Sequence, residues 1–190
     1  WKDISGFITY ELQENVDIGV VGNIGGAGPA PVLYDVSRPI NGDKAEVLGV
    51  ELGLQHFFAN GFGLRANYTY TDTKAYIDGV HVGQLEGVSE SAYSVALLFE
   101  NERWDAQLAA DYSGEYTEVT DAVAGLSQKA EPITWMTASV AYKINDTLTV
   151  SIEGRNLLDE YYLAHLGRND ILAGFETWGR SYLVGASAKF

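Results

Sequence analysis

The chain has 190 residues, and its 26 Asp and Glu against 12 Lys and Arg give a formal net charge of −14 at pH 7. So acidic a chain excludes a nucleic-acid binder that works through a basic groove. The absence of cysteine excludes disulfides, thiolate metal sites and cysteine nucleophiles. The longest strictly apolar run, residues 95–99, is far shorter than the roughly 20 residues of a membrane-spanning helix. A soluble β-rich domain and a transmembrane β-barrel both stay compatible with the mean hydropathy of −0.07.

Eight segments carry apolar side chains at every second position, which predicts β-strands with one apolar face. The clearest is the last, in which Tyr182, Val184 and Ala186 share a face. No segment has a helical period, so the sequence predicts an all-β chain. In chain order, the predicted strands are residues 1–10, 50–55, 62–72, 93–100, 104–113, 136–144, 147–155 and 181–190.

The connections between these strands alternate between short and long. Short turns with the Asn, Gly and Asp residues of tight hairpins are predicted at residues 59–61, 101–103 and 145–147, and long loops at about residues 11–43, 73–90, 114–132 and 163–178. Transmembrane barrels have short turns at one rim and long loops at the other. A Greek-key sandwich does not require this alternation. The Gly-rich segment from Gly22 to Pro31 lacks the Lys-Ser/Thr ending of a phosphate-binding loop, so we interpret it as a plain loop.

Aromatic residues stand near both ends of the predicted apolar face. Three pairs are each eight residues apart, namely Phe62 and Tyr70, Trp104 and Tyr112, and Tyr182 and Phe190. At about 3.3 Å per residue and a tilt of about 40°, this spacing spans about 20 Å, near the ~25 Å apolar band of a membrane barrel. We therefore predict antiparallel transmembrane β-barrel strands in an up-and-down meander, with the apolar face toward lipid.

Four strings carry a resemblance to a known family: GVELGLQHFFANGFGLRANYTYTDTKA (residues 49–75), GVSESAYSVALLFENERWDAQLAADYSGEY (87–116), LTVSIEGRNLLDEYY (148–162) and GRSYLVGASAKF (179–190). They resemble the C-terminal strands of TonB-dependent outer-membrane receptors, and the opening WKDISGFI resembles the preceding strand of that family. The run Asn156-Leu157-Leu158-Asp159 and the terminal Gly-Arg…Phe are the most specific parts.

This resemblance implies that the predicted strands are the last eight of a 22-stranded barrel, whose N-terminal plug domain contacts TonB. It implies a place in the outer membrane of a Gram-negative bacterium and energised uptake of a scarce nutrient, such as a siderophore–metal chelate or an oligosaccharide. Nothing in residues 1–190 resembles a plug or a TonB box, so we interpret the whole chain as barrel. The alternative is a complete eight-stranded barrel that closes on itself and serves as an anchor or an adhesin.

The predicted polar face carries charged side chains, which in such a receptor would line the lumen. We expect them to form a wall of salt bridges against the plug. They are Glu51, Arg65, Glu100, Asp105, Lys143, Glu153, Arg155 and Lys189.

Candidate sites are few. The histidines His56, His81 and His165 lack metal-ligand spacing, and no nucleophile, base and acid can be assembled from neighbours, so we predict no metal, no cofactor and no enzymatic activity. Aromatic and donor-rich residues at the outer strand ends suit a polar nutrient, although a plain aromatic girdle with solvated acidic loops explains them too. The predicted ligand contacts are Tyr116, Tyr161, Arg168 and Trp178.

The C-terminal strand carries a further expectation. Tyr182 and Phe190 lie on its apolar face, and the second is the last residue of the sequence. The pattern resembles the terminal signal that the outer-membrane barrel assembly machinery recognises. The expected partners are therefore membrane lipid, this machinery, TonB through a plug, and a small nutrient, with no nucleic acid.

Overall fold

The computed structural model describes residues 1–22, 29–123 and 126–189. Within these ranges no helix is long and apolar enough to cross a membrane.

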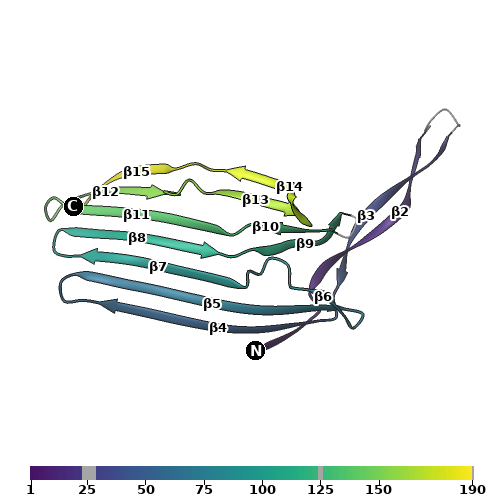
Figure 1. Ribbon diagram of the computed structural model, residues 1–190. Helices are drawn as coiled ribbons and strands as arrows, with labels where there is room; N and C mark the ends of the chain where they lie inside the picture. The colour runs from purple at the N-terminus through teal and green to yellow at the C-terminus, as the bar shows by residue number, and fades with distance from the viewer. Residues whose placement is uncertain (23–28, 124–125, 190) are drawn as a thin grey trace.

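The main sheet of the described residues contains nine strands. Its spatial order is β1 (Lys2–Ser5), β4 (Lys44–Phe57), β5 (Phe62–Ile77), β7 (Ser91–Glu100), β8 (Trp104–Ser113), β11 (Ile133–Lys143), β12 (Leu148–Arg155) and β15 (Ser181–Ala188), with β6 (Val80–Gly83) paired to β5 (Figure 1). All of its ladders are antiparallel. The eight strands of the ordered path fall on the eight predicted segments, which confirms the predicted antiparallel meander.

The three predicted short turns are confirmed, and they lie together at one end of the sheet, on the left in Figure 1. Asn side chains accept backbone hydrogen bonds in all three, and in the first turn Asn60 Oδ1 accepts one from the Phe62 amide at 3.3 Å. Asn101 Oδ1 accepts hydrogen bonds from the backbone N–H groups of Arg103 and Trp104, and Asn145 Oδ1 accepts them from Thr147 and Leu148. Such side-chain turns satisfy backbone donors that would otherwise be unpaired where a strand reverses.

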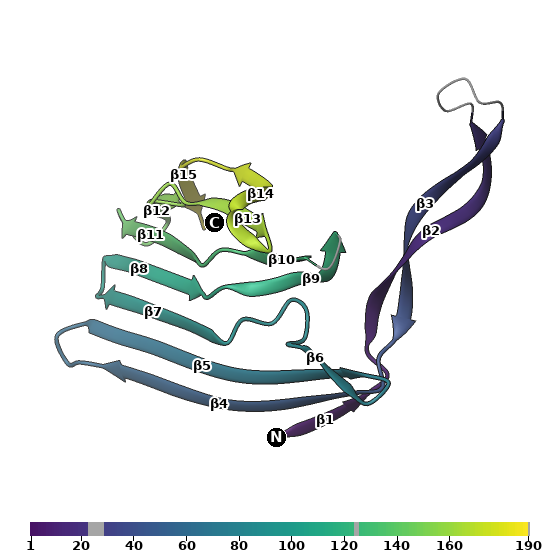
Figure 2. The same ribbon diagram turned by 45° about the vertical axis from the view of Figure 1, so that its right-hand side comes forward.

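The predicted long loops are in large part strands, which corrects that expectation. Most of the described residues between 11 and 43 belong to a hairpin of β2 (Ile8–Gly22) and β3 (Ala30–Asn41), which projects beyond the main sheet (Figure 2). A second sheet has the order β14 (Arg168–Thr177), β13 (Tyr161–Leu166), β10 (Leu126–Ala130) and β9 (Tyr116–Val123). Tyr, Thr and Val favour extended backbone, and pairing satisfies backbone polar groups, even where apolar alternation is weak. Residues 23–28 of the Gly-rich loop lie outside the described residues.

Close packing at Gly42 explains how the chain passes from the hairpin into β4. The Gly42 amide donates a 2.7 Å hydrogen bond to the carbonyl oxygen of Phe7. The Phe7 ring occupies the space that a Cβ atom at residue 42 would need. Any larger residue at this position would push the ring away and disturb the base of the hairpin.

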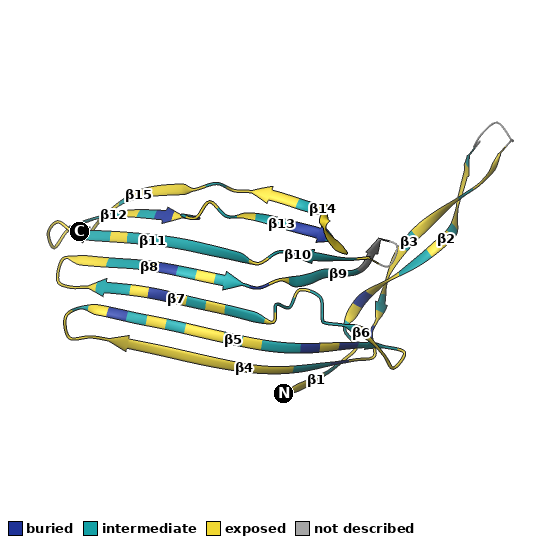
Figure 3. Cartoon of the chain, in the orientation of Figure 1, coloured by how far each residue is buried: buried dark blue, intermediate teal, exposed yellow. Residues whose placement is uncertain are grey.

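The main sheet has two chemically distinct faces. The apolar face carries the exposed side chains of Leu97 (55%) and Leu108 (41%), whereas the polar face carries Arg65 and Gln107 and the small residue Ala96. Exposed positions are interspersed with intermediate and buried ones along β5, β7 and β8 (Figure 3). A row of large apolar side chains left exposed in this way indicates a surface that meets a partner or a membrane rather than water.

Aromatic rings form a belt at each end of the apolar face. Near the short turns, the ring centroids of Phe62 and Phe99 lie 4.8 Å apart and those of Trp104 and Tyr142 lie 4.5 Å apart. At the other end, Tyr93 and Tyr112 stack at 4.5 Å with an interplanar angle of 14°. These belts match the predicted girdles on β5 and β8, and the Phe190 member of the third pair lies outside the described residues.

The two ends of the main sheet do not pair with each other. The order runs from β1 to β15, and within the described residues no ladder joins these two strands. The alternative of a closed eight-stranded barrel requires such a ladder. The described strands of the main sheet therefore form an open sheet.

Candidate functional site: the loop end of the polar face

The second sheet continues the faces of the main sheet, which decides where its side chains point. Trp104 pairs with Tyr142 in the main sheet, and Tyr116 pairs with Ala130 in the second sheet. Both strand paths advance by the same number of residues between these two pairs, so the register of the main sheet is kept. Because side chains alternate strictly along a strand, Tyr116 lies on the apolar face. Ala130 also pairs with Ala164.

The same register separates two adjacent tyrosines. Tyr162 is two residues from Ala164 and so shares the apolar face with it, whereas Tyr161 lies on the polar face. Phe175 pairs with Leu163, which places Phe175 on the polar face as well.

Four aromatic residues gather on the polar face at the end away from the short turns. The ring centroids of Tyr161 and Phe175 lie 5.3 Å apart, and those of Trp135 and Trp178 lie 5.2 Å apart. About half of the surface of Tyr161, Phe175 and Trp178 is exposed. We call Trp135, Tyr161, Phe175 and Trp178 the aromatic surface. Exposed rings in this arrangement can stack against a planar or apolar part of a ligand.

Charged groups lie on the same face. Lys129 Nζ is 2.9 Å from Glu115 Oε1, and the Nδ1 atom of the buried His165 is 3.1 Å from Glu131 Oε1. The His165 contact lacks hydrogen-bond geometry and becomes an ion pair only when the imidazole is protonated. These groups supply donors and acceptors on the face that carries the aromatic surface.

A separate network holds Glu118 on the apolar face. Its Oε2 atom accepts hydrogen bonds from the Tyr162 hydroxyl at 2.5 Å and from Gln128 Nε2 at 2.7 Å. Tyr116 Oη donates a weaker bond of 3.5 Å to Oε1. Burial, then the hydrogen bond to Glu118, raises the pKa of Tyr162 to about 12, and burial also raises the pKa of Tyr116.

This network predicts a pH dependence. Because the pKa of Tyr162 is raised above its ordinary value of 10, its stabilising contribution is complete below pH 10 and is lost as the pH rises through about 12. In an ultraviolet titration of tyrosinate, the difference between the wild type and Tyr162→Phe should show a group that titrates near pH 12. Glu118→Gln should shift that group toward pH 10, and a wild-type value near 10 would contradict the network.

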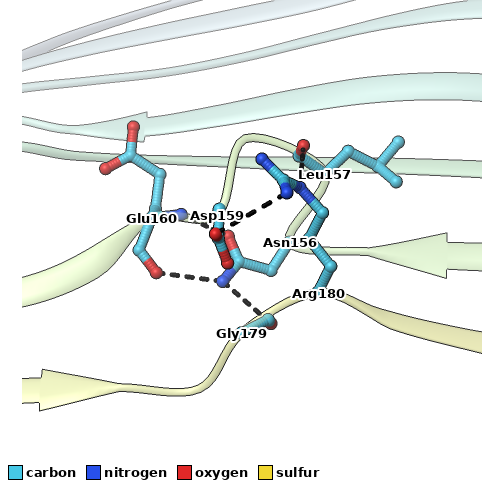
Figure 4. A network of polar contacts seen from close by, with 6 residues as sticks. All are labelled: Asn156, Leu157, Asp159, Glu160, Gly179 and Arg180. Atoms are coloured by element: carbon cyan, nitrogen blue, oxygen red, sulfur yellow. Dashed lines mark hydrogen bonds and ion pairs between the residues drawn. The ribbon is translucent and has the colours of Figure 1, made fainter.

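The run Asn156-Leu157-Leu158-Asp159 has a structural role. Asn156 is 3% exposed and has a φ of 52°. Its Nδ2 donates to the carbonyl oxygens of Glu160 (2.9 Å) and Gly179 (3.1 Å), and its Oδ1 accepts from the Glu160 amide at 2.8 Å (Figure 4). The side chain thus replaces ladder hydrogen bonds where β12 gives way to β13 and β14 gives way to β15.

Two further contacts tie this segment to its neighbours. Arg180 donates from Nε to the carbonyl oxygen of Leu157 at 3.0 Å, and its Nη1 is 3.6 Å from Asp159 Oδ2 (Figure 4). The Leu157 amide donates to the carbonyl oxygen of Met136 at 2.9 Å. We call residues 156–160 with Gly179 and Arg180 the strand clamp, because they join three neighbouring strand paths.

The structure brings together two of the four residues predicted to contact ligand. Tyr161 and Trp178 belong to the aromatic surface, whereas Tyr116 lies on the opposite face. Arg168 begins β14 and pairs with Asp170 at 2.9 Å, with both side chains largely exposed. Tyr182 is exposed on the apolar face, and Phe190 lies outside the described residues.

The predicted wall of salt bridges is formed at only one place among the described residues. Arg155 Nε lies 2.5 Å from Glu153 Oε1, while Lys143 pairs with Asp146 of a short turn at 3.0 Å. Among the same residues, no three His, Cys, Asp or Glu side chains converge as a metal site would require.

Sequence reasoning missed Trp135 and Phe175 as members of the aromatic surface. Trp135 lies one residue before the predicted strand 136–144, at a position that the alternation of that strand places on the polar face, and a Trp on this face was the signal that could have found it. Phe175 falls in a segment expected to be a loop, so no alternation pointed to its partners.

The family model described as "TonB dependent receptor-like, beta-barrel" matches residues 1–157. The chain belongs to this family. A comparison with curated proteins found no match.

Two solved receptor structures share the fold. The siderophore receptor PiuA from Acinetobacter baumannii is 21% identical with a TM-score of 0.59, and the match covers 77% of this chain and 22% of that one. The ferric-catecholate import receptor Fiu from E. coli K12 is 18% identical with a TM-score of 0.61, over 90% of this chain and 23% of that one. The chain thus spans less than a quarter of the length of either receptor.

Proposed function

We propose that this chain is part of the barrel wall of an outer-membrane receptor that takes up a siderophore–metal chelate. The aromatic surface carries the proposal, because it offers half-exposed rings on the lumen-facing side of a TonB-dependent receptor wall. Planar aromatic groups, such as the catechols of many chelators, stack on rings of this kind. The two solved neighbours, a siderophore receptor and a ferric-catecholate import receptor, support this substrate class.

The proposal includes the partners that such uptake needs. In lipid, open strand edges are not tolerated, because their backbone polar groups would be unpaired. Further strands therefore complete the barrel beside β1 and β15, and a plug domain outside residues 1–190 receives energy through TonB. We also propose that Tyr182 and Phe190 contribute to recognition by the barrel assembly machinery of a Gram-negative bacterium. TonB-dependent receptors are transporters, so we propose no enzymatic activity.

An oligosaccharide is the second candidate substrate. Sugar rings also present apolar faces that stack on aromatic side chains, and the carboxylates near the aromatic surface can accept hydrogen bonds from hydroxyl groups. Uptake assays with a ferric catecholate and with a malto-oligosaccharide separate the two classes.

Alanine at Tyr161 or Trp178 should weaken uptake. Loss of one stacking ring costs about 0.5–1.5 kcal/mol, or about two- to tenfold in ligand affinity. The measurement is uptake of a radiolabelled ferric catecholate by cells that produce the full-length receptor, with receptor abundance checked by immunoblot. Tyr116→Ala is the matched comparison, since this ring lies at a similar height on the opposite face. If Tyr161→Ala and Trp178→Ala both leave uptake unchanged, the aromatic surface does not contact this ligand.

A further inference from the structure

The apolar face contains a groove near the short-turn rim. It has a volume of about 610 Å³ and lies across β5, β7, β8 and β11, within the ~300–1,000 Å³ range of small-molecule sites. Small side chains create it. Ala106 stands in a row between Phe99 and Val140, and Ala138 stands beside Leu108 in the next row. One wall is the packed pair of Phe62 and Phe99.

Hydrogen-bond donors gather at the rim end of this groove. Trp104 and Tyr142 pack against each other one row beyond Ala106 and Val140, toward the short turns. Arg103 Nη1 donates to Tyr142 Oη at 3.5 Å, which brings the guanidinium of a turn residue to the apolar face. Since that oxygen accepts the bond, the hydroxyl proton of Tyr142 is available to another acceptor. Among the described residues, no carboxylate lies within ion-pair distance of Arg103.

We propose that this groove binds one glycerophospholipid, with an acyl chain over Ala106 and Ala138 and the phosphate at Arg103. The Arg103 guanidinium supplies a positive charge that can pair with a phosphate group. It also offers hydrogen-bond donors, together with the Tyr142 hydroxyl and the Trp104 indole N–H, and the phosphate oxygens accept such bonds. A free phosphate would leave the groove empty, and a second barrel packed on this face would bring no anion to the guanidinium. The charge complementarity and the adjoining apolar groove together select a lipid that carries both parts. This inference is independent of the transported nutrient.

The test uses the full-length receptor, purified in detergent, stripped of lipid and titrated with phosphatidylethanolamine. Native mass spectrometry counts the lipids that stay bound. At lipid concentrations where additional lipid molecules bind only weakly, the wild-type receptor should retain one bound phosphatidylethanolamine. Arg103→Gln and Ala106→Leu should each weaken that binding by about tenfold or more, because one removes a charge-assisted contact and the other fills the groove.

Two matched controls keep the result specific. Ala110→Leu makes the same change on the same face but farther from the short turns, outside the groove. Lys143→Gln removes a positive charge at the same rim, on the polar face. Both should bind like the wild type, and all variants should show the heat-dependent gel mobility of a folded barrel. Non-saturable binding by the wild type would overturn the proposal. So would an Ala106→Leu variant that binds normally, or a loss of binding in the controls equal to that in the test variants.

Discussion

Replacing Leu97 with arginine should sharply reduce the amount of folded receptor in the membrane. Leu97 is 55% exposed on the apolar face, midway between the two aromatic belts. An arginine near the bilayer midplane of a membrane barrel costs about 2–4 kcal/mol. Leu108, its partner on β8, should respond in the same way. The loss in free energy of unfolding is measured by refolding the full-length protein into lipid vesicles and then titrating it with urea.

The control for this experiment needs a site on the polar face with free space. The sequence suggests Ala96 or Ala109, but they are only 4% and 7% exposed, so an arginine there would also be crowded by its neighbours. Asn67 is exposed on the same polar face and pairs with Ser94. Asn67→Arg should therefore stay within about 1 kcal/mol of the wild type. Equal losses at Leu97 and Asn67 would show that the two faces are assigned wrongly.

Replacing Asn156 with alanine should destabilise the loop end of the barrel wall by about 2–4 kcal/mol. The substitution removes three hydrogen bonds of a buried side chain and leaves the carbonyl oxygens of Glu160 and Gly179 without this donor. Urea unfolding of the full-length receptor gives the total loss. Hydrogen exchange at the Glu160 amide should rise first, since that amide donates to the Asn156 side chain.

Two further variants separate the side chain from the backbone. Asn156 has a positive φ of 52°, which glycine adopts more readily than alanine does. Asn156→Gly should thus lose the hydrogen bonds and still be about 1 kcal/mol more stable than Asn156→Ala. Asn145→Ala, in an exposed turn with two similar side-chain bonds, should cost about 1 kcal/mol or less. If Asn156→Ala lowered the free energy of unfolding as little as Asn145→Ala, the strand clamp would not hold these strands together.

The sequence by itself determined the wall of the barrel. Strict alternation gave the eight strands and their two faces, because a half-buried strand must separate apolar from polar side chains at every second residue. The rim turns followed as well, since Asn101 and Asn145 satisfy local backbone donors within three residues of themselves. Both signals depend on residues that are close together in the sequence, so they can be recognised from the sequence without the structure.

Only the tertiary structure decided the loop end. Tyr161 and Tyr162 are neighbours with opposite orientations, and which one meets the lumen depends on how many residues the strand clamp inserts between β12 and β13. A shift of one residue would exchange the two faces. Asn156 likewise bonds to Gly179, 23 residues away. Local alternation carries no information about such distant pairing, which the ladders between strands fix only when the sheet forms.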